Sequence, residues 1–384
     1  MKAGWQTKPF EECIEKVTYT PKIQRKDFLG EGAYPIVSQE DEFINGYWYN
    51  EADLFKVTTP IVVFGDHTKV LKYVDFDFVL GADGVKVLQP RDFLFPKFFF
   101  YQLQTANLDS LGYARHYKLL KELEIIYPAR PEQQRLVGIL DEAFDGIATA
   151  KANAEKNLQN ARALFESHLQ SVFTLRGKGW VEKPLAELCD IKHGFAFDGA
   201  EFSTDVLAGN PRVITPGNFT EDGRLVFNEK NTKRFSGKPP GAFRFDVGDL
   251  VVVMTDLSSK MKILGKPAFV ETDDVLHNQR IGRVVFFNAT VEKRFVYYFM
   301  MSDGFLKNIK RSATGTMVKH TAPTRILSNV IPYLRDHKEQ LVVVAKLDSL
   351  RQETQHLESL YQQKLAALEA LKKSLLHEAF TGAL

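Results

Sequence analysis

Residues 131–173, PEQQRLVGILDEAFDGIATAKANAEKNLQNARALFESHLQSVF, decide how this chain of 384 residues is organised. The stretch has no proline after Pro131, and its only glycines are Gly138 and Gly146. Proline suits the first turn of a helix, and Gly177 suits a stop, so we expect one long helix. Apolar or small side chains recur three and four positions apart, which predicts a heptad-like seam along one face. They are Leu140, Phe144, Ile147, Ala154, Leu158, Ala161 and Phe165.

Parts of this stretch return in the second half of the chain. Glu132-Gln133, Leu140-Asp141 and Phe173-Thr174 return as Glu339-Gln340, Leu347-Asp348 and Phe380-Thr381, and Gly4-Trp5 returns as Gly179-Trp180. Weaker matches pair Val62-Val63-x-x-Asp66 with Val252-Val253-x-x-Asp256, and Phe98-x-x-Tyr101 with Phe295-x-x-Tyr298. The matches fail between these points, so the chain contains two copies of one module whose central parts have diverged.

The second copy predicts a second long helix. Asp336-x-x-Glu339 is a capping-box pattern, and the helix should run to Phe380 before Gly382. One face carries Leu347, Leu350, Leu357, Tyr361, Leu368, Leu371 and Leu375, interrupted by Lys364. Each helix would span roughly 55–65 Å and needs a partner for its apolar stripe. The two helices are natural partners for each other.

The remaining segments indicate strands and turns. Residues 1–127 hold short apolar runs such as Thr59–Phe64 and Phe78–Leu80, each followed by a glycine turn, with a short helix around Pro96–Leu108. Residues 177–334 repeat this character, with Phe243–Phe245, Leu250–Met254 and Arg283–Phe287 as expected core strands.

Composition sets limits on the class of protein. An apolar fraction of 44% and a charged fraction of 26% are ordinary for a protein with substantial cores. Cys13 and Cys189 stand alone, which argues against a disulfide framework and a cysteine-ligated zinc. The start lacks the apolar core of a signal peptide, and the richest apolar stretch, Phe93–Leu103, is too short to span a bilayer. We therefore expect a cytoplasmic protein with no membrane partner.

Charge alone does not indicate nucleic acid, because the net charge is only +2. The charge is uneven, however. Residues 1–127 carry 15 Lys and Arg against 18 Asp and Glu, whereas residues 177–334 carry 22 against 17. Any DNA-binding face must therefore come from local arrangement.

Familiar catalytic patterns are missing from the sequence. It contains no phosphate-binding G-x-x-x-x-G-K-[ST], no G-x-S-x-G and no H-E-x-x-H. The G-x-G at Gly30–Gly32 lacks a third glycine, and Asn210-Pro211-Arg212 is not the Asn-Pro-Pro-aromatic of an amino-methyltransferase. No Pro-Asp dipeptide is present to anchor a nuclease carboxylate motif. We expect no catalytic residues and no metal site in this chain.

One local cluster, Gly65-Asp66-His67-Thr68-Lys69, leaves three interpretations open. It can be a catalytic Asp-His pair, a hairpin turn in which Asp66 bonds its own backbone, or a loop presenting His67, Lys69 and Lys72 to a ligand. The second copy keeps Asp256 but has Leu257 in place of His67, so a catalytic pair shared by both copies is excluded.

The duplication, the strand-rich variable regions and the two long helices together resemble the specificity subunits of type I restriction-modification systems. Two motifs add to this resemblance: Arg325-Ile326-Leu327-Ser328-Asn329-Val330-Ile331-Pro332 before Glu339-Gln340, and the tail Leu375-Leu376-x-x-Ala379-Phe380-Thr381-Gly382-x-Leu384. The first copy departs from the pattern, since Ile125-Ile126-Tyr127-Pro128 lacks the Arg-Ile-x-x-Asn part.

The resemblance implies an α+β fold: two strand-rich target recognition domains in a pseudo-twofold arrangement, separated by two long antiparallel helices that form a coiled coil. It implies four segments, namely a first recognition domain at 1–130, a central spacer helix at 131–176, a second recognition domain at 177–335 and a C-terminal spacer helix at 336–384. It also implies a non-catalytic subunit that reads a bipartite double-stranded DNA target. Two modification subunits and the restriction subunits would dock on it, and these partners would use S-adenosylmethionine, ATP and Mg²⁺.

Side chains that read or hold DNA should be Arg, Lys, Asn, Gln and His near a groove, with lysines mainly at phosphates. Such residues cluster after the strand at 61–64, before the first long helix, and at three places in the second module. The candidate DNA-binding residues are His67, Lys69, Lys72, Arg115, His116, Lys118, Lys260, Lys262, Asn278, Gln279, Arg280, Lys319 and His320. For each of them, a solvated surface side chain is the plain alternative.

Two other functions remain open at this point. The same helices could form a scaffold that joins protein partners, with the strand modules as protein-binding units. The chain could also be an enzyme with an unrecognised site.

Overall fold

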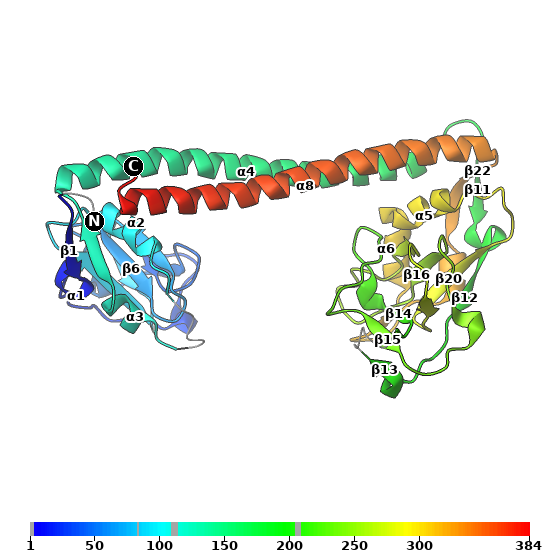
Figure 1. The fold of residues 1–384 in the computed structure, drawn as a ribbon, viewed down its shortest axis with the longest axis horizontal. Coiled ribbons are helices and arrows are strands. Elements are labelled where there is room, and N and C mark those ends of the chain that lie inside the picture. The colour runs from blue at the N-terminus through cyan, green and yellow to red at the C-terminus, as the bar shows by residue number, and fades with distance from the viewer. Residues whose placement is uncertain (1–3, 83, 109–113, 204–208) are drawn as a thin grey trace. The chain divides into compact units, whose positions relative to one another are not determined.

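The computed structural model describes residues 4–82, 84–108, 114–203 and 209–384. Contacts divide the chain into two compact units, Met1–Lys156 with Tyr361–Leu384, and Asn157–Leu360. Each unit contains one strand-rich module and one part of each long helix (Figure 1). The boundaries between the two units lie within both long helices. They do not test the division into two modules and two spacer helices, which therefore stays a prediction.

Two four-stranded sheets form the centre of the first module. Their strand orders are β2-β9-β6-β7 and β4-β3-β8-β5, and β3 and β8 are parallel. A two-stranded ladder of β1 and β10 closes the module beside the long helix. The elements are β1 (Gln6–Pro9), α1 (Phe10–Cys13), β2 (Ile14–Glu15), β3 (Tyr34–Val37), β4 (Gly46–Trp48), β5 (Leu54–Phe55), β6 (Ile61–Gly65), β7 (Leu71–Val74), β8 (Phe78–Leu80), β9 (Val85–Pro90), α2 (Pro96–Gln104), α3 (Tyr117–Lys121) and β10 (Glu124–Tyr127).

The second module repeats this plan. Its sheets have the orders β12-β20-β16-β18 and β13-β15-β14-β19, β14 and β19 are parallel, and β11 pairs with β22 as β1 does with β10. The elements are β11 (Trp180–Pro184), β12 (Cys189–His193), β13 (Phe202–Ser203), β14 (Arg212–Ile214), β15 (Lys233–Phe235), β16 (Leu250–Val253), β17 (Thr255–Asp256), β18 (Pro267–Phe269), β19 (Val275–His277), β20 (Ile281–Phe286), α5 (Lys293–Met301), α6 (Asp303–Ser312), β21 (Lys319–His320), α7 (Pro323–Leu327) and β22 (Val330–Leu334). The repeat seen in the sequence is therefore a repeat of topology.

One expected strand is wrong. Gly241–Phe243 forms a single 3₁₀ turn, and Arg244 makes only an isolated bridge to Leu276. Pro239 and Pro240 come directly before this turn, and neither can donate a backbone hydrogen bond to a sheet. Phe245 nevertheless points into the core, where its ring packs 4.5 Å from that of His277.

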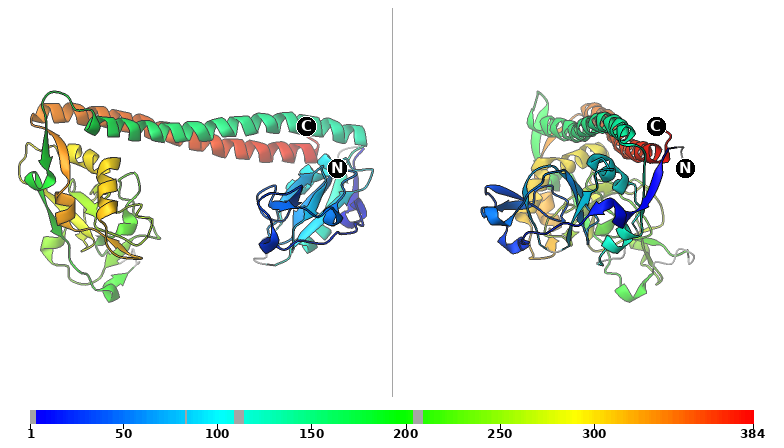
Figure 2. Two further views of the ribbon diagram at one scale, coloured as in Figure 1. Left: turned by 180° about the vertical axis from the view of Figure 1, so that it is seen from behind. Right: turned by 90° about the vertical axis from the view of Figure 1, so that its left-hand side faces the viewer.

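Both predicted long helices are present, as α4 (Arg130–Thr174) and α8 (His337–Thr381), each of 45 residues. The Asp336 carboxylate accepts the Lys338 amide at 2.8 Å and so caps the start of α8. In the first unit the Lys151 ammonium meets Glu369 at 2.7 Å, and in the second unit Arg162 meets Glu358 at 2.8 Å. Residue numbers fall along α8 as they rise along α4, so the helices pair antiparallel in each unit, as the left view in Figure 2 shows.

The apolar stripe of α8 deviates from the expectation near its end. Leu371 is 47% exposed, and the half-buried face of this part of the helix passes through Leu365 and Lys372. Lys364 is exposed, so it lies outside the stripe and does not interrupt it. The Lys372 ammonium sits 5.2 Å from the Phe144 ring centre, so its stem covers apolar surface while its charge contacts an aromatic face.

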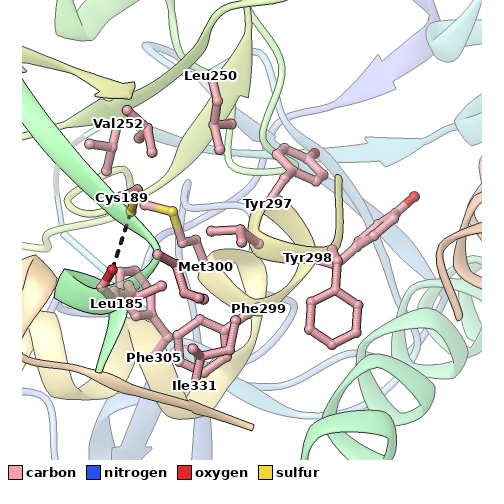
Figure 3. Close-up of a cluster of buried hydrophobic side chains, with 14 of the residues drawn as sticks. Leu185, Cys189, Leu250, Val252, Tyr297, Tyr298, Phe299, Met300, Phe305 and Ile331 are labelled. Carbon is pink, nitrogen blue, oxygen red and sulfur yellow. Dashed lines mark hydrogen bonds between the residues drawn. The ribbon is translucent and has the colours of Figure 1, made fainter. Parts of the chain in front are cut away.

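The core of the second unit surrounds the short helix α5 (Figure 3). Tyr298, Phe295 and Phe305 are almost fully buried there, beside Val252 of the central strand and Ile331 of β22. In the first unit, α2 takes the same place, with Phe98 packed 5.0 Å from Phe380 near the end of α8. Each short helix thus connects a strand-rich module to the helix pair.

A partly buried polar joint binds α2 to α4 in the first unit. The Tyr101 hydroxyl donates to the Asp141 carboxylate, which Lys97 also approaches at 2.7 Å. Nearer the N-terminus of α4, the buried Gln133 side chain accepts the Phe95 amide at 2.7 Å and donates to two carbonyls before the helix. We call this set of contacts the first joint.

The second joint repeats these contacts between α5 and α8. The Tyr298 hydroxyl donates to Asp348, and Arg294 approaches the same carboxylate at 2.7 Å. Gln340 accepts the Glu292 amide and donates to the Leu334 carbonyl, both at 2.8 Å. Burial, together with the hydrogen bond to Asp348, raises the pKa of Tyr298, so its hydroxyl remains a donor at neutral pH. The residues that the sequence repeats are therefore the residues that form the joints.

Replacement of Gln340 by alanine should lower the free energy of unfolding by about 2–4 kcal/mol, because a buried amide and a buried carbonyl would lose their partners. Urea unfolding of the purified chain measures this change. Gln355→Ala, at an exposed position of the same helix, is the matched control and should cost less than about 0.5 kcal/mol. Equal effects of the two substitutions would show that the joint does not stabilise the fold.

Candidate nucleic-acid interface

In the first module, Asp66 brings two of the predicted clusters together. It ends the central strand β6, and its backbone carbonyl accepts the His116 amide at 2.8 Å. Its carboxylate accepts the Tyr117 amide at 2.7 Å. The turn that carries His67 and Lys69 is thereby held against the segment that carries Arg115 and Lys118, although about fifty residues separate them in the chain.

The hairpin interpretation of this turn is confirmed, since β6 and β7 pair antiparallel. The expected bond of Asp66 to its own turn is replaced by the bond to Tyr117, which lies 51 positions away. The turn is instead tied to Gln39, whose carbonyl accepts the Thr68 hydroxyl at 2.6 Å and whose side chain accepts the His67 amide at 3.3 Å. The Asp66 carboxylate therefore connects the turn to the backbone of the segment at Tyr117.

The six candidates of the first module differ in exposure. Arg115 and Lys118 are exposed, and His67 and Lys69 are half-buried. Lys72 is buried, and its ammonium donates to the carbonyl of Glu42 and to the side chain of Asn45. Burial lowers the pKa of Lys72, and the loop oxygens compensate the charge.

His116 is the other buried candidate of this module. Its ring nitrogen Nδ1 lies 3.0 Å from the carbonyl of Asp66. The buried side chains of His116 and Lys72 thus stabilise the loops through hydrogen bonds. Among the six candidates, the exposed cations are Arg115 and Lys118.

In the second module, the segment from Met254 to Asp256 gathers three clusters. The Met254 amide donates to the Arg280 carbonyl, and its carbonyl accepts the Thr321 amide, both at 2.9 Å. The following residues Thr255 and Asp256 pair with His320 and Lys319 as β17 and β21. The Asp256 carboxylate then accepts the amides of Ser258 and Ile263, at 2.8 and 3.0 Å. The loop with Lys260 and Lys262 is thereby fixed next to the other two clusters.

The seven candidates of the second module are mostly accessible. Lys260, Lys262, Gln279, Arg280 and His320 are exposed, and Lys319 is half-buried. Lys262 pairs with Glu221 at 2.6 Å, and the Lys319 ammonium donates to the Gly315 carbonyl at 2.8 Å. Over the described residues, the side chains of Lys260, Gln279 and Arg280 make no hydrogen bond or ion pair.

Asn278 is buried and shapes the turn that presents Gln279 and Arg280. Its side-chain oxygen accepts the Arg280 amide at 2.9 Å. The amide of Phe195 donates to the His277 carbonyl, and the Phe195 carbonyl accepts the Gln279 amide, so a second segment braces the turn. A Cβ at Gly194 would lie 2.4 Å from the Asn278 backbone, which explains glycine at this close approach.

Comparison with known proteins finds relatives of one kind. The sequence profile described as the type I restriction modification DNA specificity domain matches residues 2–159. The specificity subunit of the type I restriction enzyme MjaVIII from Methanocaldococcus jannaschii is 23% identical over 330 residues, which cover 79% of this chain and 74% of that relative. A solved chain described under complex assembly and conformational transition of the type I R-M system aligns with a TM-score of 0.73 at 16% identity, covering 100% of this chain and 99% of that one.

The chain is similar to type I specificity subunits, and the match to the family profile covers its first module and part of the first long helix. The EcoBI specificity subunit from Escherichia coli is also similar, at 23% identity over 224 residues, or 58% of this chain. The alignment spans 43% of that relative, so this chain matches less than half of its length. The fold expected from the sequence, strand-rich modules with two long antiparallel helices, is confirmed for this chain.

In the part of the chain that the structure describes, none of the helices combines the length and the apolarity needed to cross a membrane. A groove of about 1430 Å³ lies elsewhere in the second unit. It is lined by residues of the second joint such as Tyr298 and Asp348, and none of the thirteen candidates lines it.

Sequence patterns alone did not identify two features of this chain. Asp66 and Asp256 hold the loops that carry the candidate residues in place, and their repetition was the available signal. Leu257 and Met317 are strongly exposed apolar side chains beside the basic clusters, at 61% and 80%. A lone leucine and a lone methionine carry no sequence signal, because single exposed apolar side chains are common.

The stability of the second module should depend on pH through His277. Burial lowers the pKa of His277 to about 4, the Arg283 charge acts in the same direction, and the hydrogen bond to the Ile281 carbonyl opposes both. His193 also lowers this pKa, and Asp249 raises it. The unfolded chain binds a proton at His277 near its ordinary pKa of 6.5, so unfolding is favoured as the pH falls from 6.5 to 4.

Chemical unfolding at pH 7 and pH 4.5 should therefore show a loss of about 2–3 kcal/mol that His277 contributes. His277→Gln keeps a donor for the Ile281 carbonyl but cannot be protonated. This variant should lose that part of the pH dependence, even if it is less stable at pH 7. If the pH dependence of the free energy of unfolding is unchanged in this variant, groups other than His277 cause it.

Proposed function

We propose that this chain is a type I specificity subunit and reads a bipartite DNA sequence, with one half read by each strand-rich module. The observation that carries the proposal is the repeated use of an aspartate after the central strand, Asp66 or Asp256, to gather distant basic segments on one surface. Exposed Arg and Gln suit hydrogen bonds to base edges, and exposed Lys suits phosphates.

Within each surface, we assign different tasks to different candidates. Arg115 in the first module, and Gln279 and Arg280 in the second, are exposed and have the donor geometry for base edges. Lys118, Lys260 and Lys262 would neutralise phosphates. The ion pair of Lys262 with Glu221 is exposed, and such a pair costs little to exchange for a phosphate.

The remaining candidates make contacts within the protein itself. Lys319, His320, His67 and Lys69 lie at the edges of these surfaces, partly engaged by backbone or neighbouring groups. Lys72, His116 and Asn278 are buried and would hold the loops in the conformation that DNA meets.

We further propose that the chain is not itself an enzyme and works in a complex. Its relatives are subunits of type I restriction enzymes, and modification and restriction subunits would supply the methyl transfer and the DNA cleavage. The chemistry of S-adenosylmethionine, ATP and Mg²⁺ would then belong to those partners. The antiparallel helices would hold the two modules so that both halves of the target are read together.

Two alternatives make different predictions. A scaffold that joins protein partners would give no DNA footprint in the assembled complex. An enzyme with an unrecognised site would transfer methyl groups or cleave DNA as the purified chain alone. We expect a footprint in the complex and no activity of the chain without partners.

Binding measurements on the first module test the proposal directly. Arg115→Ala should weaken binding of the target by about 1–3 kcal/mol and relax discrimination at one base pair, if this side chain contacts guanine. Lys118→Ala should weaken all sequences alike and reduce the salt slope by about one. Lys156→Ala removes an exposed charge from α4 and is the control, for which we expect no change. If neither substitution at 115 or 118 alters binding, this surface does not contact DNA.

Insertions in the helices test whether they set the gap between the half-sites. Because α8 packs back on the first module through Phe380, four residues should be inserted in both helices, after Gln159 and after Leu360. Four residues add about 6 Å and just over one turn, which nearly preserves the apolar seam. The half-sites should stay the same while the gap lengthens by roughly one or two base pairs, at about 3.4 Å each.

Two inserted residues per helix are the matched control, because they rotate the seam by about 200° and should abolish folding or assembly. Methylation mapping in cells that express the complex measures the gap. Full activity with an unchanged gap in the four-residue variant would show that the helices do not determine the spacing.

A further inference from the structure

The two joints share their buried core but differ at two equivalent positions. The spacing that relates Tyr101 to Tyr298 also relates Phe100 to Tyr297, and the spacing that relates Asp141 to Asp348 relates Phe144 to Arg351. The first joint therefore has two phenylalanines where the second has a tyrosine and an arginine.

In the first joint, these positions make aromatic contacts and one contact with a cation, that of Lys372 with the Phe144 ring. The Phe144 ring lies 5.2 Å from that of Tyr101 in an edge-on arrangement, and the Phe100 ring lies 5.6 Å from the same tyrosine. Aromatic packing of this kind is attractive over a range of ring angles and distances.

In the second joint, Arg351 makes directional bonds to two other parts of the module. One guanidinium nitrogen donates to the Tyr297 hydroxyl, and the other donates to the Asp222 carbonyl at 2.6 Å. The Tyr297 hydroxyl donates in turn to the Gly223 carbonyl at 3.0 Å. Tyr297 and its neighbour Tyr298 both project from α5 in Figure 3. We call these three bonds the tether, since they link α8, α5 and the turn at 222–223.

The turn at 222–223 is built to receive the tether. Gly223 has a φ of +78°, and a Cβ there would lie 2.8 Å from the Tyr297 hydroxyl and 2.5 Å from the Met301 sulfur. Burial opposes ionisation of Asp222, but bonds from Thr220 and Arg224 and the charge of Arg351 lower the pKa of Asp222 overall. Burial also opposes the charge of Arg351, but its contacts with Tyr297 and Asp222 outweigh that effect and raise its pKa.

The turn also reaches the proposed DNA-contacting loop. Glu221, next to Asp222, pairs with Lys262 at 2.6 Å. Lys262 belongs to the loop whose conformation Asp256 fixes through the amides of Ser258 and Ile263. A continuous series of contacts thus runs from α8 through the tether to a basic loop of the second module.

We propose that Arg351 is a positioning residue that fixes the angle of the second recognition module on α8, and so narrows the range of gap lengths that the subunit accepts. This inference rests on the proposed function. The first module lacks such a tether among its described residues, and its joint tolerates small rotations. The two half-sites would therefore be read with one rigid and one adaptable module.

The decisive variants replace residues of the second joint by the residue types found in the first joint. Tyr297→Phe removes only the hydroxyl, and the double variant Tyr297→Phe with Arg351→Phe reproduces the residue types of the first joint. Arg162→Ala is the control, since it breaks an exposed ion pair with Glu358 in the same unit without touching the tether.

Hydrogen exchange on the purified full chain measures the tether itself. Amides of residues 220–224 should exchange about tenfold faster in the double variant and in Tyr297→Phe, because bonds to a charged group are lost. The control should match the unaltered chain. Unchanged exchange in both variants would show that the tether does not hold the turn, and would overturn the proposal.

Methylation mapping with the modification subunits measures the consequence. The half-site sequences should stay the same, while targets with a gap one base pair longer or shorter should gain modification about tenfold relative to the preferred gap. A strict gap in a folded variant, or a changed second half-site with a strict gap, would overturn the proposal. If the double variant does not fold, Tyr297→Phe decides the question. Absence of any bipartite methylation with the unaltered chain would reject the proposed function instead, and hydrogen exchange would still test the tether.

Discussion

The structure depends on one interaction that occurs twice, the hydrogen bond from a buried tyrosine to a partly exposed helix aspartate. Tyr101 with Asp141 and Tyr298 with Asp348 each connect a short helix of a module to a long helix, and a lysine or an arginine pairs with the same carboxylate. Loss of the carboxylate would leave the hydroxyl of a buried tyrosine without its partner, so this bond fixes the position of each short helix along its long helix. The glutamines at 133 and 340 add the same constraint at the helix start.

These joints explain why the ends of the repeat are alike and its middle is not. The joint residues must match one another in position and chemistry, which leaves few alternatives. The loops beyond Asp66 and Asp256 can differ in sequence, provided that the aspartate still holds their backbone. A protein that reads two different half-sites needs this combination of a fixed frame and variable loops. The polar tether of Arg351 suggests that the frame itself also differs between the modules.

The candidate surfaces were only partly predictable. Basic residues near each other in the sequence were easy to find, and ten of the thirteen candidates are exposed or half-buried, consistent with a surface. Lys72, His116 and Asn278 have the same chemistry but are buried, because loop oxygens and backbone groups satisfy them. A side chain's type does not reveal whether its partners are water, DNA or a neighbouring loop. That distinction depends on contacts between residues far apart in the chain.

The sequence by itself determined the two long helices, most of the core strands and the duplication, because periodicity and repeated identities are local properties of the chain. It failed at Phe243–Phe245, where the preceding prolines favour a turn, and at Leu371, where the drift of the helical face moves the stripe to Lys372. Only the tertiary structure decided that the repeated residues meet in the joints, and that Met254–Asp256 gathers three basic clusters. The physical reason is that hydrogen bonds between residues far apart in the chain depend on how the sheets and helices pack, which no local pattern records.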